Sequence, residues 1–183
     1  MEKIKEKEAI RYFDETLYDI SILYITSDRF WDGGIHLDSS LKEKVAFYTM
    51  TEKMSAILKS ILSVLDEPVY IGKPLCEYGD IYAPFSGLKK FETFRTIHKT
   101  IGNRKCYALS LPEDDEIIDL IVESNFRYFS FISFFLPQSN IIFRPSCHTE
   151  ILVYTENKQK VLPILESAVE QFSDESQRIC VKQ

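Results

Sequence analysis

The sequence predicts an α+β fold, in which a helical N-terminal third packs against a mixed, mainly antiparallel sheet flanked by helices. Residues 1–65 contain no proline, whereas all seven prolines lie between Pro68 and Pro163. The first part carries mostly helical apolar spacing, and short β-rich runs alternate with helical patterns after it. The 183 residues, 45% hydrophobic and 27% charged, suit one domain, with a mainly helical portion at 1–66 and a sheet-and-helix portion at 67–183.

The N-terminal portion is expected to hold two helical segments, of which the first is ambiguous. Apolar residues recur there at steps of three and four, at Ile10, Phe13, Leu17, Ile20 and Tyr24, and we favour a helix. Because 18–26 is also β-rich and partly alternating, Leu17–Thr26 is open to a strand instead. After a loop at 27–40, a long amphipathic helix capped by Ser39 or Ser40 is predicted from Leu41, Val45, Tyr48, Met54, Leu58, Ile61 and Leu65.

The next segments alternate between strand and helix. A short strand is predicted around 69–71, then a helix that opens at Ser86 and stops at Gly102. A strand at 106–111 follows. The spacing of Ser110 and Glu113 is that of a capping box, with Pro112 in the first turn. This pattern explains the acidic run 113–116 as a helix start, because acidic residues are favoured there, and the helix would bury Ile117, Ile118, Ile121 and Val122.

The C-terminal third is predicted to contain a hairpin and a closing helix. The run 128–136 is aromatic and β-rich on both faces, as in a central strand, and 137–140 can turn the chain into a partner strand at 141–143. Pro145 is expected to interrupt the sheet or to lie at its edge, since it has no N–H to donate. A strand at 150–154 follows, then a helix with Pro163 in its first turn, and a frayed tail after Ser173.

Charge and composition exclude several function classes. The net charge of −6 argues against nucleic-acid binding, where affinity comes from many cationic contacts with phosphates. The segment 86–107 is the exception, with Glu92 against six basic residues: Lys89, Lys90, Arg95, Lys99, Arg104 and Lys105. It is either a solvated helix face covered by neighbouring acids or a contact for one anionic group.

The same composition bears on compartment and cofactors. The charged N-terminus does not resemble a leader, and the nine apolar residues 128–136 are too few for a helix that crosses a bilayer, so no membrane contact is expected. Cys76, Cys106, Cys147 and Cys180 form no CxxC pair, so we expect reduced thiols in the cytoplasm and no metal. Glycine-rich nucleotide motifs and hydrolase signatures are absent, so no cofactor is expected.

The first candidate site is the segment Arg144–Glu150. In an extended strand Arg144, Ser146, His148 and Glu150 would share one face, and an imidazole beside a carboxylate suits acid–base chemistry. Cys147 would then point away from His148, which disfavours a Cys–His nucleophilic pair unless a bulge intervenes. His148, Glu150 and Cys147 are therefore candidate catalytic residues to which no catalytic role is assigned, and a plain sheet edge is the structural alternative.

Two other segments could bind a partner. In the loop 28–38, Phe30, Trp31 and Asp32 resemble the stiff aromatic anchors of protein interfaces. Its acids and His36 lack a coordination spacing for a metal. Tyr78 and Tyr82 lie among acidic residues, as in adaptable binding surfaces. Core packing is the alternative for each of these aromatic residues.

Two hypotheses follow for function. The first is a non-catalytic cytosolic interaction domain whose acidic surface meets a basic protein, for example a bacterial immunity protein that neutralises a basic toxin. The second is a small enzyme or ligand-binding domain that uses the Arg144, Ser146, His148 and Glu150 face. A homo-oligomer is compatible with both hypotheses. We expect the first, because no catalytic signature is present.

Overall fold

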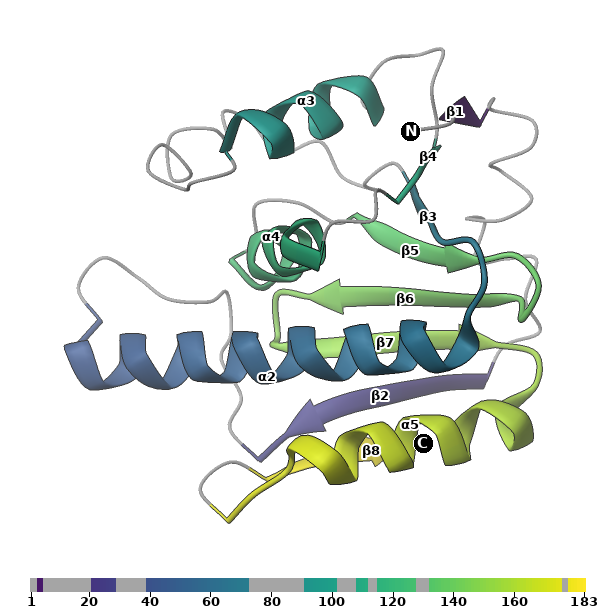
Figure 1. The fold of residues 1–183 in the computed structure, drawn as a ribbon. Helices are drawn as coiled ribbons and strands as arrows, with labels where there is room; N and C mark the ends of the chain where they lie inside the picture. Colours follow the sequence, from purple (N-terminus) through teal and green to yellow (C-terminus); the bar gives the residue numbers. More distant parts are fainter. Residues whose placement is uncertain are drawn as a thin grey trace.

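One antiparallel sheet organises the chain (Figure 1). The computed structural model describes residues 3–4, 21–28, 39–72, 91–101, 108–111, 115–127, 132–175 and 178–183. Within them the sheet has eight strands in the order β1-β4-β3-β5-β6-β7-β2-β8. The strands are β1 (Lys3–Ile4), β2 (Ser21–Ser27), β3 (Tyr70–Gly72), β4 (Ala108–Ser110), β5 (Ser133–Leu136), β6 (Ile141–Ser146), β7 (Glu150–Thr155) and β8 (Ile179–Lys182).

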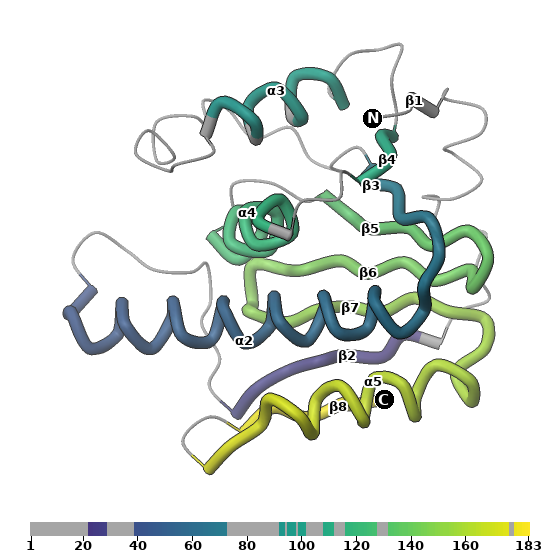
Figure 2. Tube along the Cα trace, viewed as in Figure 1, coloured from purple at the N-terminus to yellow at the C-terminus, as the bar shows by residue number. Residues whose placement is uncertain are grey.

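Four helices accompany this sheet in the described ranges: α2 (Leu41–Leu65), α3 (Phe91–Ile101), α4 (Asp115–Phe126) and α5 (Lys158–Phe172). Apolar residues of all four join one face of the sheet in a single core, and α2 and α5 run side by side across that face (Figures 1 and 2). The opposite face carries a smaller cluster of Phe135, Ile142 and Tyr154. The α+β prediction is confirmed. All seven pairings between described strands are antiparallel.

Helix α2 begins at a capping box. Ser40 Oγ accepts from the Glu43 amide at 3.3 Å, and the Ser40 amide donates to Glu43 Oε2 at 2.7 Å. Ser40 Oγ also donates to Glu43 Oε2, at 2.7 Å. This side-chain bond and the bond from the Ser40 amide lower the pKa of Glu43, because both favour the carboxylate. At the other end, Asp66 takes a left-handed conformation (φ 44°) and its amide bonds to Leu62. Of the two predicted N-cap residues, Ser39 and Ser40, the structure has Ser40.

The buried face of α2 differs in part from the predicted one. It consists of residues spaced by three and four, namely Phe47, Met50, Met54, Ile57 and Ile61, with Leu58 and Leu62 beside them. Met54, Leu58 and Ile61 were correctly predicted as apolar-face residues. Leu41, Val45 and Tyr48 lie on another face and are exposed, so their assignment to the same amphipathic face was wrong. This helix therefore carries two apolar stripes.

Pro145 does not interrupt its strand, but it lies beyond the residues of β6 that pair with β5, so the predicted edge position holds on that side alone. It lies in β6, a strand with neighbours on both sides, and is in register with Ile151 of β7. The Asn125 amide of α4 replaces the missing strand partner: its Nδ2 donates to the carbonyls of Pro145 (2.9 Å) and Ile132 (2.8 Å), and its Oδ1 accepts from the Ile132 amide (3.2 Å). The N and O of one residue point to the same side in an antiparallel strand. Pro145 therefore directs its nitrogen away from β7, where it breaks no ladder bond.

Three further corrections concern the ends of elements. Residues 21–27 form β2 rather than the favoured helix, because they pair with β7 on one side and β8 on the other. Pro163 is the sixth residue of α5, not in its first turn, and is exposed, so it removes one helical bond on the solvent side. The tail after Ser173 is not frayed throughout, since β8 pairs with β2.

Other predictions are confirmed with small shifts of boundary. The strands around 69–71 and 106–111 become β3 and β4, the hairpin at 137–140 joins β5 to β6, and the strand at 150–154 becomes β7. All four side chains of β5 are buried, as expected of a central strand. Among the described helices, none combines the length and the apolar character that crossing a membrane requires.

Candidate functional site

The segment Arg144–Glu150 forms the end of a β-hairpin rather than one extended strand. β6 ends at Ser146, residues 147–149 turn, and β7 begins at Glu150, which lies opposite Ser146. Because cross-strand partners share a face, Arg144, Ser146 and Glu150 lie together, as predicted. His148 occupies the turn, so its predicted place in a strand alternation was wrong. The turn also holds Thr149 at φ 56°, an uncommon conformation for a β-branched residue.

The charged groups of this hairpin bond to other strands. Arg144 is only 8% exposed; its Nε donates to Ser133 Oγ at 3.0 Å, and its guanidinium lies 5.2 Å from the centre of the Tyr154 ring. Glu150 Oε1 accepts from Thr26 Oγ1 of β2 at 3.0 Å. These contacts tie β5, β6, β7 and β2 together on the face opposite the helices. Arg144 and Glu150 therefore stabilise the packing of neighbouring strands in the folded chain.

The remaining side chains of the segment lie in or beside the turn. Ser146 Oγ accepts from the His148 amide at 3.3 Å, and His148 is half-buried. Cys147 is buried, and neither it nor Cys180 forms a disulfide. Among the described residues, no three side chains of the metal-binding types gather into a site.

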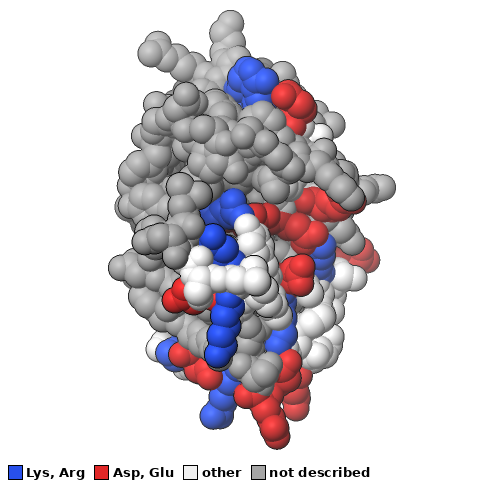
Figure 3. Space-filling view, turned by 90° about the vertical axis from the view of Figure 1, so that its left-hand side faces the viewer, with Lys and Arg blue, Asp and Glu red and all other residues white. Residues whose placement is uncertain are grey.

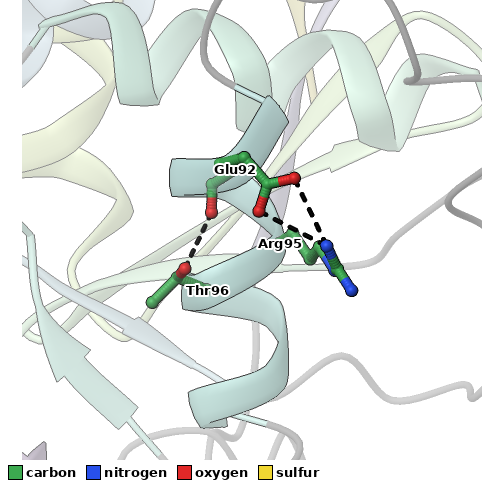
Figure 4. Close-up of polar contacts among 3 residues, drawn as sticks. All are labelled: Glu92, Arg95 and Thr96. Atoms are coloured by element: carbon green, nitrogen blue, oxygen red, sulfur yellow. Dashed lines mark hydrogen bonds and ion pairs between the residues drawn. The ribbon is translucent and has the colours of Figure 1, made fainter.

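Other predicted binding residues lie outside the described ranges. These are Phe30, Trp31 and Asp32 of the loop at 28–38, and Tyr78 and Tyr82. Part of the basic segment is described in α3, where Arg95 Nη1 donates to both carboxylate oxygens of Glu92, at 3.3 and 3.4 Å (Figure 4). Thr96 Oγ1 bonds to the Glu92 carbonyl. One cation of the segment is thus balanced by the acid on its own helix.

A different surface, on α2, has the features of a binding site. Leu41, Val45 and Tyr48 are 78%, 57% and 40% exposed and lie on successive turns of one side of the helix. We call these three residues the outer stripe. Scattered exposed apolar residues need no explanation, but large ones aligned at helical spacing form a continuous surface. In Figure 1 the N-terminal half of α2 projects beyond the ends of the strands.

Tyr48 of the outer stripe is held in place by α4. Arg127, the residue after that helix, donates from Nη2 to Tyr48 Oη, and its guanidinium lies 5.3 Å from the Tyr48 ring centre. Phe47 meets the same ring edge-on, with ring centres 5.8 Å apart. An aromatic side chain fixed in this way loses little further entropy when a partner covers it.

A groove between α2 and α4 begins at Tyr48. Its volume is about 370 Å³, and it is lined by Tyr48, Thr51, Glu52, Ser55, Ala56, Lys59, Asp119 and Glu123. We call it the α2–α4 groove. Two ion pairs border it, Lys59–Asp119 at 2.7 Å and Arg127–Glu123 at 2.9 Å.

A second cavity, of about 510 Å³, lies between the turn after β5 and the start of α5. Glu67 accepts there from the amides of Gln138 and Ser139, at 2.6 and 3.0 Å, and Asn157 caps α5 by accepting from the Lys160 amide at 3.2 Å. These polar groups are already used to hold the turn and the helix start. The smaller α2–α4 groove, of 370 Å³, has polar groups that are not used in this way.

Electrostatics distinguish the α2–α4 groove further. Burial raises the pKa of Glu123, because the charged carboxylate is poorly solvated; Arg127 opposes this shift and Asp119 adds to it.

Figure 3 shows the side toward which the N-terminal end of α2 points, and on its described part blue and red side chains surround white ones. This side is therefore mixed in charge rather than uniformly acidic.

Sequence reasoning missed this surface, although a signal was present. Leu41, Val45 and Tyr48 were assigned to the single apolar face of the predicted helix, whereas Phe47 and Met50 begin a second, complete apolar stripe. A helix with two such stripes has one more than a single core contact requires.

Comparison of the chain with protein-family models, curated proteins and solved structures finds no match.

Proposed function

We propose that this chain is a non-catalytic protein-binding domain of the cytoplasm, which binds a basic partner protein through the outer stripe of α2. The observation that carries this proposal is the exposure of Leu41, Val45 and Tyr48 on successive turns of one helix. Covering such side chains removes apolar surface from water, which stabilises a complex by about 25 cal/mol per Å² before the cost of association. An amphipathic helix face is a common way to present such anchors.

The restraint on Tyr48 supports the same function. Tyrosine is enriched among the few residues that dominate interface energies, and these residues are surrounded by groups that exclude water. Arg127 and Phe47 hold the Tyr48 ring before any partner arrives. A ring held in this way is suited to act as an anchor.

Charge supports a basic partner. The chain carries a net charge of −6, which raises the encounter rate with a positively charged protein. Because the described side around the N-terminal end of α2 is mixed in charge (Figure 3), we assign long-range attraction to the whole chain and specific contacts to single residues. An immunity-type protein, which covers the active site of a basic toxin, is one concrete form of this function.

The enzyme hypothesis receives less support. It needs Arg144 and Glu150 to act on a ligand, but Arg144 bonds to Ser133 and Glu150 bonds to Thr26 within the sheet. Such contacts stabilise a hairpin without any ligand. We therefore place the binding function on α2 rather than on this hairpin.

The test is a comparison of captured proteins between variants. Bait proteins would be the wild type, a Leu41→Ser/Val45→Ser double variant and a Val64→Ser control, because Val64 is also exposed (64%) on α2 but outside the outer stripe. Partners found with the wild type would be identified, purified and titrated against each variant. We expect a basic protein whose affinity falls about 30-fold in the double variant, as for the loss of about 2 kcal/mol of anchor energy, and is unchanged in the control.

Two outcomes would contradict the proposal. The first is a partner that binds all three proteins equally, because the outer stripe would then not be the contact. The second is self-association that the double variant abolishes, measured by sedimentation, because the stripe would then join copies of this chain.

A further inference from the structure

The base of the α2–α4 groove contains an unused hydrogen-bonding group. Ser55 is 1% exposed, lines the groove, and its Oγ has no hydrogen-bond partner. A buried hydroxyl without a partner loses about 1–3 kcal/mol relative to a bonded one. Thr51, one turn earlier on α2, avoids this loss by donating to the Phe47 carbonyl at 2.9 Å. Ser55 is therefore a polar group in the groove that a ligand could satisfy.

The same region has further polar atoms in need of partners. Glu123 Oε1 is buried and accepts no hydrogen bond, although it lies 2.9 Å from Arg127 in an ion pair. Glu52 lines the groove from α2 and is exposed. Of the carboxylates that line the groove, Asp119 and Glu123 have cationic partners in Lys59 and Arg127. Within the groove lining, Glu52 therefore adds a negative charge that neither of these two ion pairs balances.

We propose that the α2–α4 groove receives a lysine or arginine side chain of the partner protein, with the cation between Glu52, Ser55 and Glu123. This inference rests on the proposed function and names the contact that would make the partner's basic character specific. The cation would donate to Ser55 Oγ and to the two carboxylates. The groove lies next to Tyr48, so a partner helix or loop covering the outer stripe would bring a side chain to it.

The shape and charge of the groove favour a long cationic side chain over other ligands. Lysine and arginine carry their charge at the end of an apolar stem, which can pass between two helices while the head group meets polar atoms. Ala56 in the lining leaves room for such a stem. An anion would meet Glu52 and Glu123 and be repelled. A cation would relieve the poor solvation that raises the pKa of Glu123.

The experiment uses small probes, so that it does not depend on knowing the partner. Nα-acetyl-lysine N-methylamide and its arginine analogue would be titrated into the full chain at low ionic strength, with backbone amide shifts followed by NMR. The norleucine analogue, which has the stem without the charge, is the control ligand. We expect saturable shifts around 48–59 and 119–123 for both cations, with dissociation constants on the order of millimolar, and none for norleucine.

Variants assign the contact. Glu52→Gln is expected to weaken binding about fivefold and Ser55→Ala about threefold, as for one surface ion pair and one hydrogen bond. Glu170→Gln removes an equal charge from an exposed position on α5 and should leave the affinity unchanged. No saturable cation binding, equal binding of norleucine, or equal effects of Glu52→Gln and Glu170→Gln would each overturn the inference.

The two experiments distinguish an error in the groove assignment from an error in the proposed function. If the double variant of the outer stripe releases the partner but the probes do not occupy the groove, only the groove assignment is wrong. If the probes occupy the groove but the outer stripe makes no difference to any partner, the groove binds cations and the proposed function is wrong.

Discussion

Asn125 provides a prediction whose size can be worked out from its contacts. Its side chain is fully buried at the end of α4 and makes three hydrogen bonds, to the carbonyls of Pro145 and Ile132 and from the amide of Ile132, at 2.8–3.2 Å. These bonds hold α4 against the hairpin of β6 and β7. They also supply the partner that Pro145 lacks on its β5 side. Replacing Asn125 by alanine should therefore loosen this corner of the sheet.

The expected loss is about 3 kcal/mol in the free energy of unfolding. Each of the three bonds contributes about 1 kcal/mol net, and the backbone groups they satisfy are buried. Asn125→Asp keeps the shape and can still accept from the Ile132 amide. Its carboxylate cannot donate to two carbonyls, so this variant should be less stable at pH 7 than at pH 4, where protonation restores one donor.

Urea unfolding followed by tryptophan fluorescence and circular dichroism measures this loss. Ser124→Ala is the matched control, because Ser124 is equally buried on the same helix and its Oγ donates to the carbonyl of Ile121, at 2.9 Å within α4. It should cost about 1 kcal/mol. If Asn125→Ala were no more destabilising than Ser124→Ala, the role assigned to Asn125 would be refuted.

Three other predictions concern stability. Between pH 4 and pH 7, Glu123→Gln should become more stable relative to the wild type. The pKa of Glu123 is raised in the folded chain, so the wild type loses unfolding free energy as the pH rises through this range, whereas glutamine does not titrate. A difference in unfolding free energy that stayed constant with pH, measured with urea, would contradict this. Ser40→Ala should lose about 1 kcal/mol at neutral pH through the N-cap. This loss should shrink as the pH falls below 4.5, the ordinary pKa of a glutamate, because the hydrogen bond from Ser40 that lowers the pKa of Glu43 stabilises only the ionised carboxylate. A loss that grew as the pH fell would contradict this. Deleting 178–183 should cost at least about 2 kcal/mol, because it removes β8 together with the buried Ile179 side chain, and an unchanged melting temperature would argue against that pairing.

Local patterns predicted the elements whose cause is local. The buried residues of α2 and α5 recur at helical spacing, and the turn at 137–140 lies between two apolar runs, so these segments were found from sequence. β2 was ambiguous because its apolar residues fit both periods. Its strand form depends on β7 and β8, which lie more than 120 residues away. β8 was missed for the same reason, as four residues give little pattern of their own.

The binding surface was missed for a different reason. Apolar residues at helical spacing predict a buried face, but the pattern does not say what buries it. On α2 the stripe with Phe47 and Met54 packs on the sheet, whereas Leu41 and Val45 remain exposed. In the same way, the sequence placed Arg144 and Glu150 on one face but could not show that Ser133 and Thr26 bond to them. These contacts depend on which strands become neighbours.

Hydroxyl-radical footprinting of the purified complex tests the assignment of the interface most directly, because it reports side-chain exposure residue by residue. We expect Leu41, Val45 and Tyr48 to lose reactivity when the partner binds, while exposed Val64 on the same helix keeps its reactivity. Protection confined to the turn at 147–149, with the three α2 side chains as reactive as in the unbound protein, would contradict the account.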